Sequence, residues 1–243
     1  MNALFVKIFA ERNCGAAELG RDIRKAWHVT EMRGAPELDR ASLRSILKSV
    51  PPRERAALHN HMLDTEHDRI LYSDFGWSAT APSPDIIQSA AHAADTLFVG
   101  VTMHPAAFAA ALNARPRTPG AATRQMPLPD WLAQPFPIHR RDGLGDEEPR
   151  LPLALWTAKA RALLKLADTD REVLLLQAAN LRETAEAALT PHMMRKEDTK
   201  PGFARIEVPN WEPALRRLPG RDLREFRLQL DDGIMRALGY DPL

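Results

Sequence analysis

Short, largely apolar runs that alternate with segments of helical periodicity are the feature that most constrains how this chain can fold. The clearest runs span residues 4–9, 97–101 and 173–176. Each has the length of a strand and lacks the polar alternation of a half-exposed one, which is typical of strands covered on both faces. The first run leads into 16–27, where apolar residues recur four apart. This alternation predicts an α/β fold with a mostly parallel sheet flanked by helices.

The remaining segments extend the same pattern along the chain. The spacing of their apolar residues predicts a longer helix as the last element, over 222–238. Further helices are predicted at 39–47, 51–62, 84–94, 108–112, 153–166 and 181–189, a short one around Trp131, and strands at 70–72 and 203–208.

Domain organisation is predicted to be a single domain over 1–243, because one α/β unit of this length is the better prior. Residues 116–150 interrupt it with closely spaced prolines and form an irregular excursion. Long excursions in compact domains tend to be lids or binding loops, so a lid is expected here.

Charge and cysteine content exclude several classes of protein. Lysine plus arginine number 33 and aspartate plus glutamate 32, so there is no basic excess of the kind that nucleic-acid binders carry. The single cysteine, Cys14, excludes an internal disulfide framework and a zinc site built on several thiolates. The histidines and carboxylates of 59–68 do not predict a metal site, because His59 and His61 point in different directions on a helix. No metal is expected.

Localisation is predicted to be cytoplasmic, with no membrane partner. The apolar run at the N-terminus is far shorter than a signal-peptide core. The longest uncharged stretch, 96–114, contains Gly100, Pro105 and Asn113 and divides into a strand pattern and a helix pattern rather than one bilayer-spanning helix. No sequence feature indicates the oligomeric state.

The loop after the first run has the layout of an anion site. Amides at the start of a helix, together with the helix dipole, favour phosphate or sulfate, and Gly15 supplies the tight turn. Arg12 adds a planar cation that can hold a phosphate by two hydrogen bonds, and Asn13 can orient another oxygen. The Walker arrangement of glycines, lysine and hydroxyl is absent, so an ordinary strand-to-helix turn fits the pattern too.

The same loop resembles that of a known family. Residues 7–19 read Lys-Ile-Phe-Ala-Glu-Arg-Asn-Cys-Gly-Ala-Ala-Glu-Leu, which resembles the phosphosulfate-binding loop Lys-Ile-Phe-Gly-Glu-Arg-Asn-Thr-Gly-Thr-Asn-Tyr-Leu of a bacterial sulfotransferase-like family. Further segments are similar to that family's motifs in the same order: 75–77, 96–105, 115–116, 152–161 and 230–240. Each motif alone is loose, but five in the right order are much more specific.

The resemblance implies a three-layer fold like that of the P-loop NTPases and membership of the sulfotransferase superfamily. It implies 3′-phosphoadenosine-5′-phosphosulfate as donor, with no metal, and a hydroxyl or amine on a small molecule or glycan as acceptor. The donor-binding residues that it implies are Arg12, Asn13, Cys14, Gly15, Ala16, Ala17 and Arg115.

Departures from the family pattern fall on its polar positions. Ala16 and Ala17 stand where the family has Thr-Asn, and Ser78 and Ala79 where it has Lys-His. Met103 replaces a cation beside the expected 3′-phosphate site. Two alternatives therefore stay open: a divergent enzyme that uses other residues for the same donor, or a sulfotransferase fold without catalysis that binds a ligand or a partner protein.

Two further residues are candidates for chemistry. His104, at the end of the 97–101 run, could act as general base because its ordinary pKa is near neutral, although it could also cap the next helix. Cys14 lies beside Arg12 at a helix N-terminus, where a thiol pKa is lowered, and could be a nucleophile or simply a small loop residue.

Overall fold

The structure is a computed structural model. It describes residues 3–11, 14–30, 45–55, 57–59, 61–62, 76–78, 80–83, 87, 92–114, 127–197, 199, 202–203 and 219–242. Several predictions lie wholly or largely outside these residues: the helices at 39–47 and 84–94, the strands at 70–72 and 203–208, and the candidate residues Arg12, Asn13 and Arg115.

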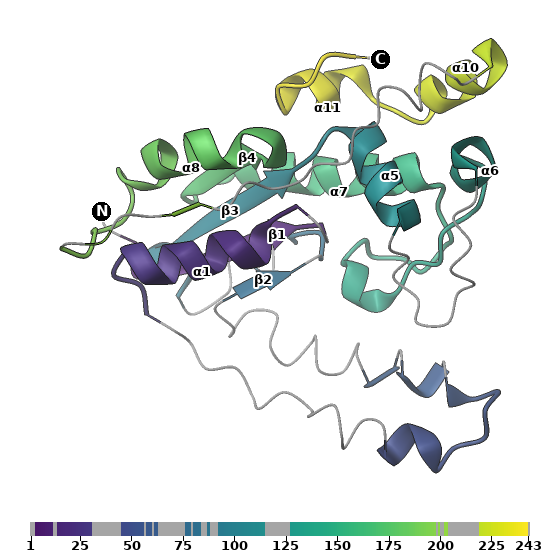
Figure 1. The fold of residues 1–243 in the computed structure, drawn as a ribbon, viewed down its shortest axis with the longest axis horizontal. Coiled ribbons are helices and arrows are strands. Elements are labelled where there is room, and N and C mark those ends of the chain that lie inside the picture. The colour runs from purple at the N-terminus through teal and green to yellow at the C-terminus, as the bar shows by residue number, and fades with distance from the viewer. Residues whose placement is uncertain are drawn as a thin grey trace.

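A parallel sheet forms the centre of the described chain (Figure 1). Its strands are β1 (Phe5–Ala10), β2 (Gly76–Ser78), β3 (Thr96–Thr102) and β4 (Val173–Gln177), in the order β2-β1-β3-β4. All three pairings are parallel. The three apolar runs are therefore strands, and the predicted α/β class with a mostly parallel sheet is confirmed.

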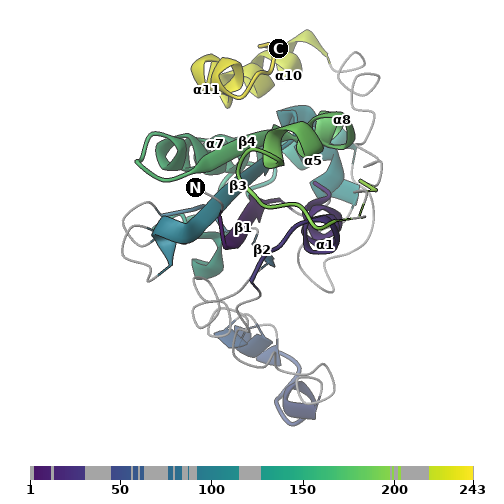
Figure 2. The ribbon, with the colours of Figure 1, turned by 90° about the vertical axis from the view of Figure 1, so that its left-hand side faces the viewer.

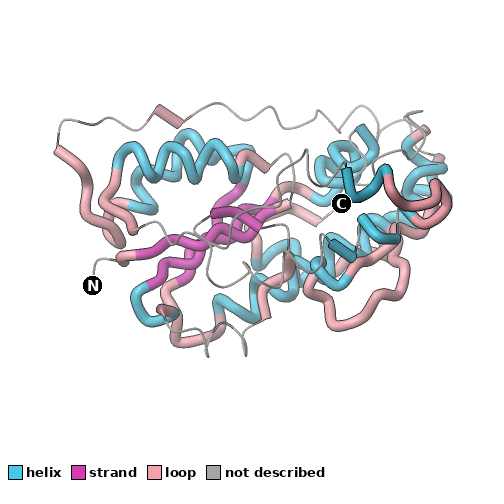
Figure 3. The backbone as a smooth tube through the Cα atoms, turned by 90° about the horizontal axis from the view of Figure 1, so that it is seen from below, coloured by secondary structure: helices cyan, strands magenta, loops and turns pink. Residues whose placement is uncertain are grey.

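Helices cover both faces of the sheet, which gives three layers (Figure 2). On one face, α1 (Ala16–Ala26) and α8 (Leu181–Leu189) pack against side chains such as Ile8 and Val99. On the other face, α7 (Pro152–Ala167) packs against Phe9 and Phe98 through Leu163 and its neighbours. Burial on both sides explains why the strands carry continuous apolar runs. Seen from below, the strands lie side by side between helices (Figure 3).

The end of the described chain differs from the prediction. Instead of one helix over 222–238, the structure has α10 (Gly220–Leu228) and α11 (Asp232–Ala237). The break occurs because the Asp231 carboxylate accepts the N–H groups of Gly233 and Ile234 and so caps a new helix. An aspartate that binds nearby amides in this way competes with continuation of a helix.

Residues 127–150 belong to the proline-rich excursion and pack on the domain. They contain α6 (Leu128–Leu132) and a 3-10 turn, Arg140–Asp142, and Phe136 pairs with Arg150 in an isolated bridge. The side chains of Phe136 and Ile138 are buried in the main core. The lid assigned to this excursion stays a prediction.

Two more features complete the architecture. Helix α5 (Pro105–Ala114) follows β3 directly and packs on α7. Among the described residues, no helix combines the length and the apolar character that a membrane crossing requires.

Candidate functional site

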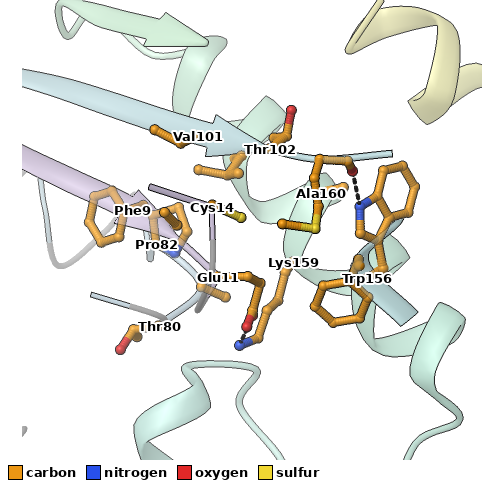
Figure 4. A pocket seen from close by; sticks show the side chains of 15 residues that line it. Phe9, Glu11, Cys14, Thr80, Pro82, Val101, Thr102, Trp156, Lys159 and Ala160 are labelled. Atoms are coloured by element: carbon orange, nitrogen blue, oxygen red, sulfur yellow. Dashed lines mark hydrogen bonds and ion pairs between the residues drawn. The ribbon is translucent and has the colours of Figure 1, made fainter. Parts of the chain in front are cut away.

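A cavity lies at the carboxyl ends of β1 and β3, against α7 (Figure 4). Its empty volume is about 430 Å³, which includes solvent-filled space at its opening. Ligands of parallel α/β sheets bind at this edge, so the cavity stands where the fold places function. Its lining residues are Phe9, Ala10, Glu11, Cys14, Thr80, Ala81, Pro82, Val101, Thr102, Met103, Phe108, Trp156, Lys159, Ala160 and Leu163.

The turn from β1 to α1 adjoins this cavity. Gly15 precedes α1 with φ of 78°, a left-handed conformation that glycine adopts without the steric cost of a side chain. The Cys14 N–H donates to the Glu11 carbonyl oxygen at 3.3 Å. The amides of the first turn of a helix have no acceptor within the helix, and amides of this kind bind oxyanions; Cys14, Gly15 and Ala16 are themselves buried. The predicted strand, glycine turn and helix are confirmed.

Cys14 is buried and lines the cavity. Burial raises the pKa of its thiol far above the ordinary range, and the negative charge of Glu11 acts in the same direction. The thiolate is the reactive form of cysteine. The expectation of a lowered thiol pKa is therefore wrong, because burial and the Glu11 charge outweigh the backbone hydrogen bond and the Lys159 charge, which act in the opposite direction.

A buried cluster of charges forms one wall of the cavity. The Lys159 ammonium of α7 pairs with the Glu11 carboxylate and with Oδ1 of Asp142, the latter at 3.1 Å. The side chains of these three residues are 8%, 12% and 5% exposed, so the charges are held largely away from water. Figure 4 shows the ammonium beside the Glu11 carboxylate. The cluster ties the end of β1 to α7 and to the turn at Arg140–Asp142.

Asp142 also anchors the segment that carries it. Its second carboxylate oxygen accepts the His139 N–H at 3.0 Å, and its carbonyl accepts the Ala81 N–H at 2.8 Å. The Thr80 hydroxyl donates to the Arg141 carbonyl at 2.8 Å. Residues 80–82 and the turn thereby hold each other in place beside the cavity.

Sequence reasoning missed Glu11, Asp142 and Lys159 as site residues. One signal for Lys159 was available, since it lies four residues after Leu155 and four before Leu163 on the buried stripe of α7. A lysine on such a stripe requires a buried counter-charge. Nothing local in the sequence indicates which carboxylates supply it.

His104 lies between β3 and α5. Its Nδ1 accepts the Ala106 N–H at 3.2 Å, and its ring meets the edge of Tyr240 at 5.7 Å between centroids. Burial lowers the pKa of His104 to about 4, so the imidazole is neutral at neutral pH. With Nδ1 accepting a hydrogen bond, the proton of the neutral ring is on Nε2. The geometry matches the helix-capping alternative, and the catalytic role stays a prediction.

The residues present fit the sulfate-bearing end of the expected donor better than its 3′-phosphate. The β1–α1 turn offers backbone amides to an oxyanion. On the β3–α5 side, Met103 and Ala111 are buried, and residues 92–114 contain no lysine or arginine. The Met103 carbonyl accepts the Trp156 indole N–H at 2.9 Å. A 3′-phosphate at this place would therefore need a cation from elsewhere, and Arg115 lies outside the described residues.

Comparisons with known proteins give matches in structure only. No family model matches the chain, and no curated protein matches it in sequence. One similar solved structure is the sulfotransferase domain from the curacin biosynthetic pathway, at 10% identity over 100% of this chain and 99% of that chain, with a TM-score of 0.46. Another is the sulfotransferase domain from the Synechococcus PCC 7002 olefin synthase, at 13% identity over 98% and 88%, with a TM-score of 0.38.

Proposed function

We propose that this chain transfers a sulfuryl group from 3′-phosphoadenosine-5′-phosphosulfate to a hydroxyl or amine acceptor. The observation that carries the proposal is the turn at Gly15, which leads from β1 into α1 beside the cavity. This turn falls within 7–19, the segment that resembles a phosphosulfate-binding loop. Local geometry and sequence motif thus support the same chemistry at the same place.

The chain's own contribution in this proposal is to hold and orient. The amides of Gly15, Ala16 and Ala17 would donate to the phosphosulfate oxygens, with Arg12 and Asn13 adding the side-chain contacts that the resemblance implies. The donor supplies the sulfuryl group: the acceptor oxygen or nitrogen bonds to sulfur, the bond from sulfur to the phosphate oxygen breaks, adenosine 3′,5′-bisphosphate leaves, and the acceptor proton passes to water. Donors held in advance of the reaction act where negative charge develops.

A second candidate function is a ligand-binding or partner-binding module without catalysis. The observation that favours it is the pairing of Lys159 with two carboxylates, because that cluster offers no net positive charge to an anion. Ala16 and Ala17 also favour this second candidate, since they lack the polar groups that the resembled loop carries at these positions. Both candidates use the same cavity and differ in whether the donor binds.

Calorimetric titration with adenosine 3′,5′-bisphosphate separates the two candidates. Saturable binding to the wild-type protein is expected from the enzyme. Ala17→Asp is the sharpest variant, because a carboxylate in the first turn of α1 suits the helix dipole yet repels a bound anion. The Ala17→Asp variant should no longer bind the bisphosphate, and its melting temperature should stay that of the wild-type protein.

Ala17→Ser is the matched neutral control and should bind at least as well as wild type. If the folded wild-type protein gives no heat of binding, the transfer proposal fails and the module remains. Binding that Ala17→Asp leaves intact would show that the ligand lies away from this turn. Where the bisphosphate binds, transfer from the full donor is then measured directly.

A further inference from the structure

We infer that the cavity beside α7 is the acceptor subsite and that it takes a small, uncharged apolar alcohol, aromatic or aliphatic, rather than a sugar. The inference rests on the proposed function, because only a transferase has an acceptor. It narrows the acceptor from any small molecule or glycan to one chemical class.

The lining of the cavity is mostly apolar, and its aromatic rings come from three separate elements. Phe9 lies in β1, one residue before its end, Phe108 lies in α5 and Trp156 in α7. Aliphatic side chains such as Val101 and Leu163 complete the walls. Pockets of this composition hold a ligand by burying its apolar surface and orient it with a few polar groups.

Polar groups in the lining already have protein partners. The Thr80 hydroxyl donates to the Arg141 carbonyl, and the Thr102 hydroxyl lies 2.9 Å from the Tyr240 hydroxyl. Glu11 and Lys159 are paired with each other. A sugar gives up several hydrogen bonds to water on entering, and each of its polar groups left without a new partner weakens binding. The walls therefore suit a ligand with one hydroxyl and an apolar body.

Charge among the described residues of the wall disfavours an anionic acceptor, which lacks the helix amides and the Arg12 contact that the proposed function assigns to the donor. One ammonium, that of Lys159, faces the two carboxylates of Glu11 and Asp142. The sum over these three groups is one negative charge, and like charges in a partly buried site repel strongly. An uncharged acceptor avoids that cost.

The position of the cavity places the ligand's hydroxyl near the donor turn. Glu11 directly follows β1 and Cys14 directly precedes Gly15 and α1, and both residues line the cavity. Leu163 lies on α7, more than one helical turn after Trp156, among the apolar walls. A ligand whose hydroxyl approaches Glu11 has its apolar body among these walls and its oxygen on the side of the turn.

The test uses 2-naphthol as an apolar alcohol and N-acetylglucosamine as a sugar, each titrated without donor. We expect saturable binding of 2-naphthol to the wild-type protein and none of the sugar at the same concentrations. Ala160→Phe fills the cavity from α7 and should weaken naphthol binding at least tenfold. Ala158→Phe, the same substitution on the same helix outside the lining, should leave it within twofold.

A second, milder variant covers the case in which Ala160→Phe fails to fold. Ala160→Val adds two methyl groups to the same wall and should weaken 2-naphthol binding at least threefold, while Ala158→Val, outside the lining, should leave it within twofold. Sugar binding tighter than naphthol binding, or a folded Ala160→Phe or Ala160→Val variant with unchanged naphthol affinity, would overturn the inference.

Parallel titration with adenosine 3′,5′-bisphosphate keeps the two proposals apart. A protein that binds 2-naphthol but not the bisphosphate would refute sulfuryl transfer while leaving the ligand class of the cavity in place. A protein that binds the bisphosphate but not 2-naphthol would refute the acceptor class alone.

Discussion

Replacing Lys159 by methionine tests the buried charge cluster most directly. Methionine keeps a long unbranched side chain and removes the ammonium. Two carboxylates, those of Glu11 and Asp142, would then face each other with little access to water, since their side chains are 12% and 5% exposed. Removing one partner from a buried ion pair costs about 3–5 kcal/mol, because it leaves uncompensated charge in the interior. Against a typical stability of about 5–15 kcal/mol, that is a large fraction.

The loss should depend on pH in a definite direction. Protonation neutralises the stranded carboxylates, so the destabilisation of Lys159→Met relative to wild type should shrink as the pH falls from 7 toward about 4.5. Urea unfolding followed by circular dichroism at both pH values measures this difference. Lys165→Met, an exposed lysine on the same helix, is the matched control and should change stability by less than about 0.5 kcal/mol.

A triple variant separates charge from packing. Glu11→Gln and Asp142→Asn added to Lys159→Met remove every charge of the cluster, and much of the lost stability should return because no ion is left unpaired. A loss below about 1 kcal/mol in the single variant would contradict this reasoning. So would a loss of equal size at both pH values, since packing rather than charge would then be its cause.

Three other expectations concern separate parts of the chain. Arg12→Ala should weaken the binding of adenosine 3′,5′-bisphosphate by about 1.5–3 kcal/mol in calorimetry, the scale of charged hydrogen bonds, and unchanged binding would remove Arg12 from the site. Burial lowers the pKa of His104 from 6.5 to about 4, so between these values the unfolded chain binds a proton that the folded one does not, and stability falls as the pH falls through that window. His104→Asn, which can still cap α5, should lose less stability over the same window in urea unfolding. Asp231→Ala should cost about 1 kcal/mol in the same assay by removing the cap of α11, whereas Asp231→Asn should cost much less.

Much of the fold follows from the apolar pattern of the sequence. The runs at 4–9, 97–101 and 173–176 agree with β1, β3 and β4 to within one residue at every end, and the predicted helix at 181–189 has the bounds of α8. These elements are readable because burial on one or both sides imposes a period on the side chains.

Other elements depend on partners that lie far away in the sequence. Strand β2 has only three residues, Gly76–Ser78, and no pattern of its own, so its extended form is defined by pairing with β1. The sequence predicts helical structure over 222–238 but not the break between α10 and α11. The apolar period continues across 229–231 while the Asp231 side chain starts a new helix.

The residues of the candidate site also divide into those that the sequence predicts and those that it does not. The turn at Gly15 was predictable because strand, glycine and helix are consecutive, whereas Glu11, Asp142 and Lys159 meet only in the folded chain. What the sequence does contain is the position of Lys159 within a buried stripe, and a buried ammonium is stable only beside negative charge. The existence of a counter-charge could be inferred, and its identity could not. It follows that the three residues are interdependent: an apolar residue in place of Lys159 should make the burial of both carboxylates costly.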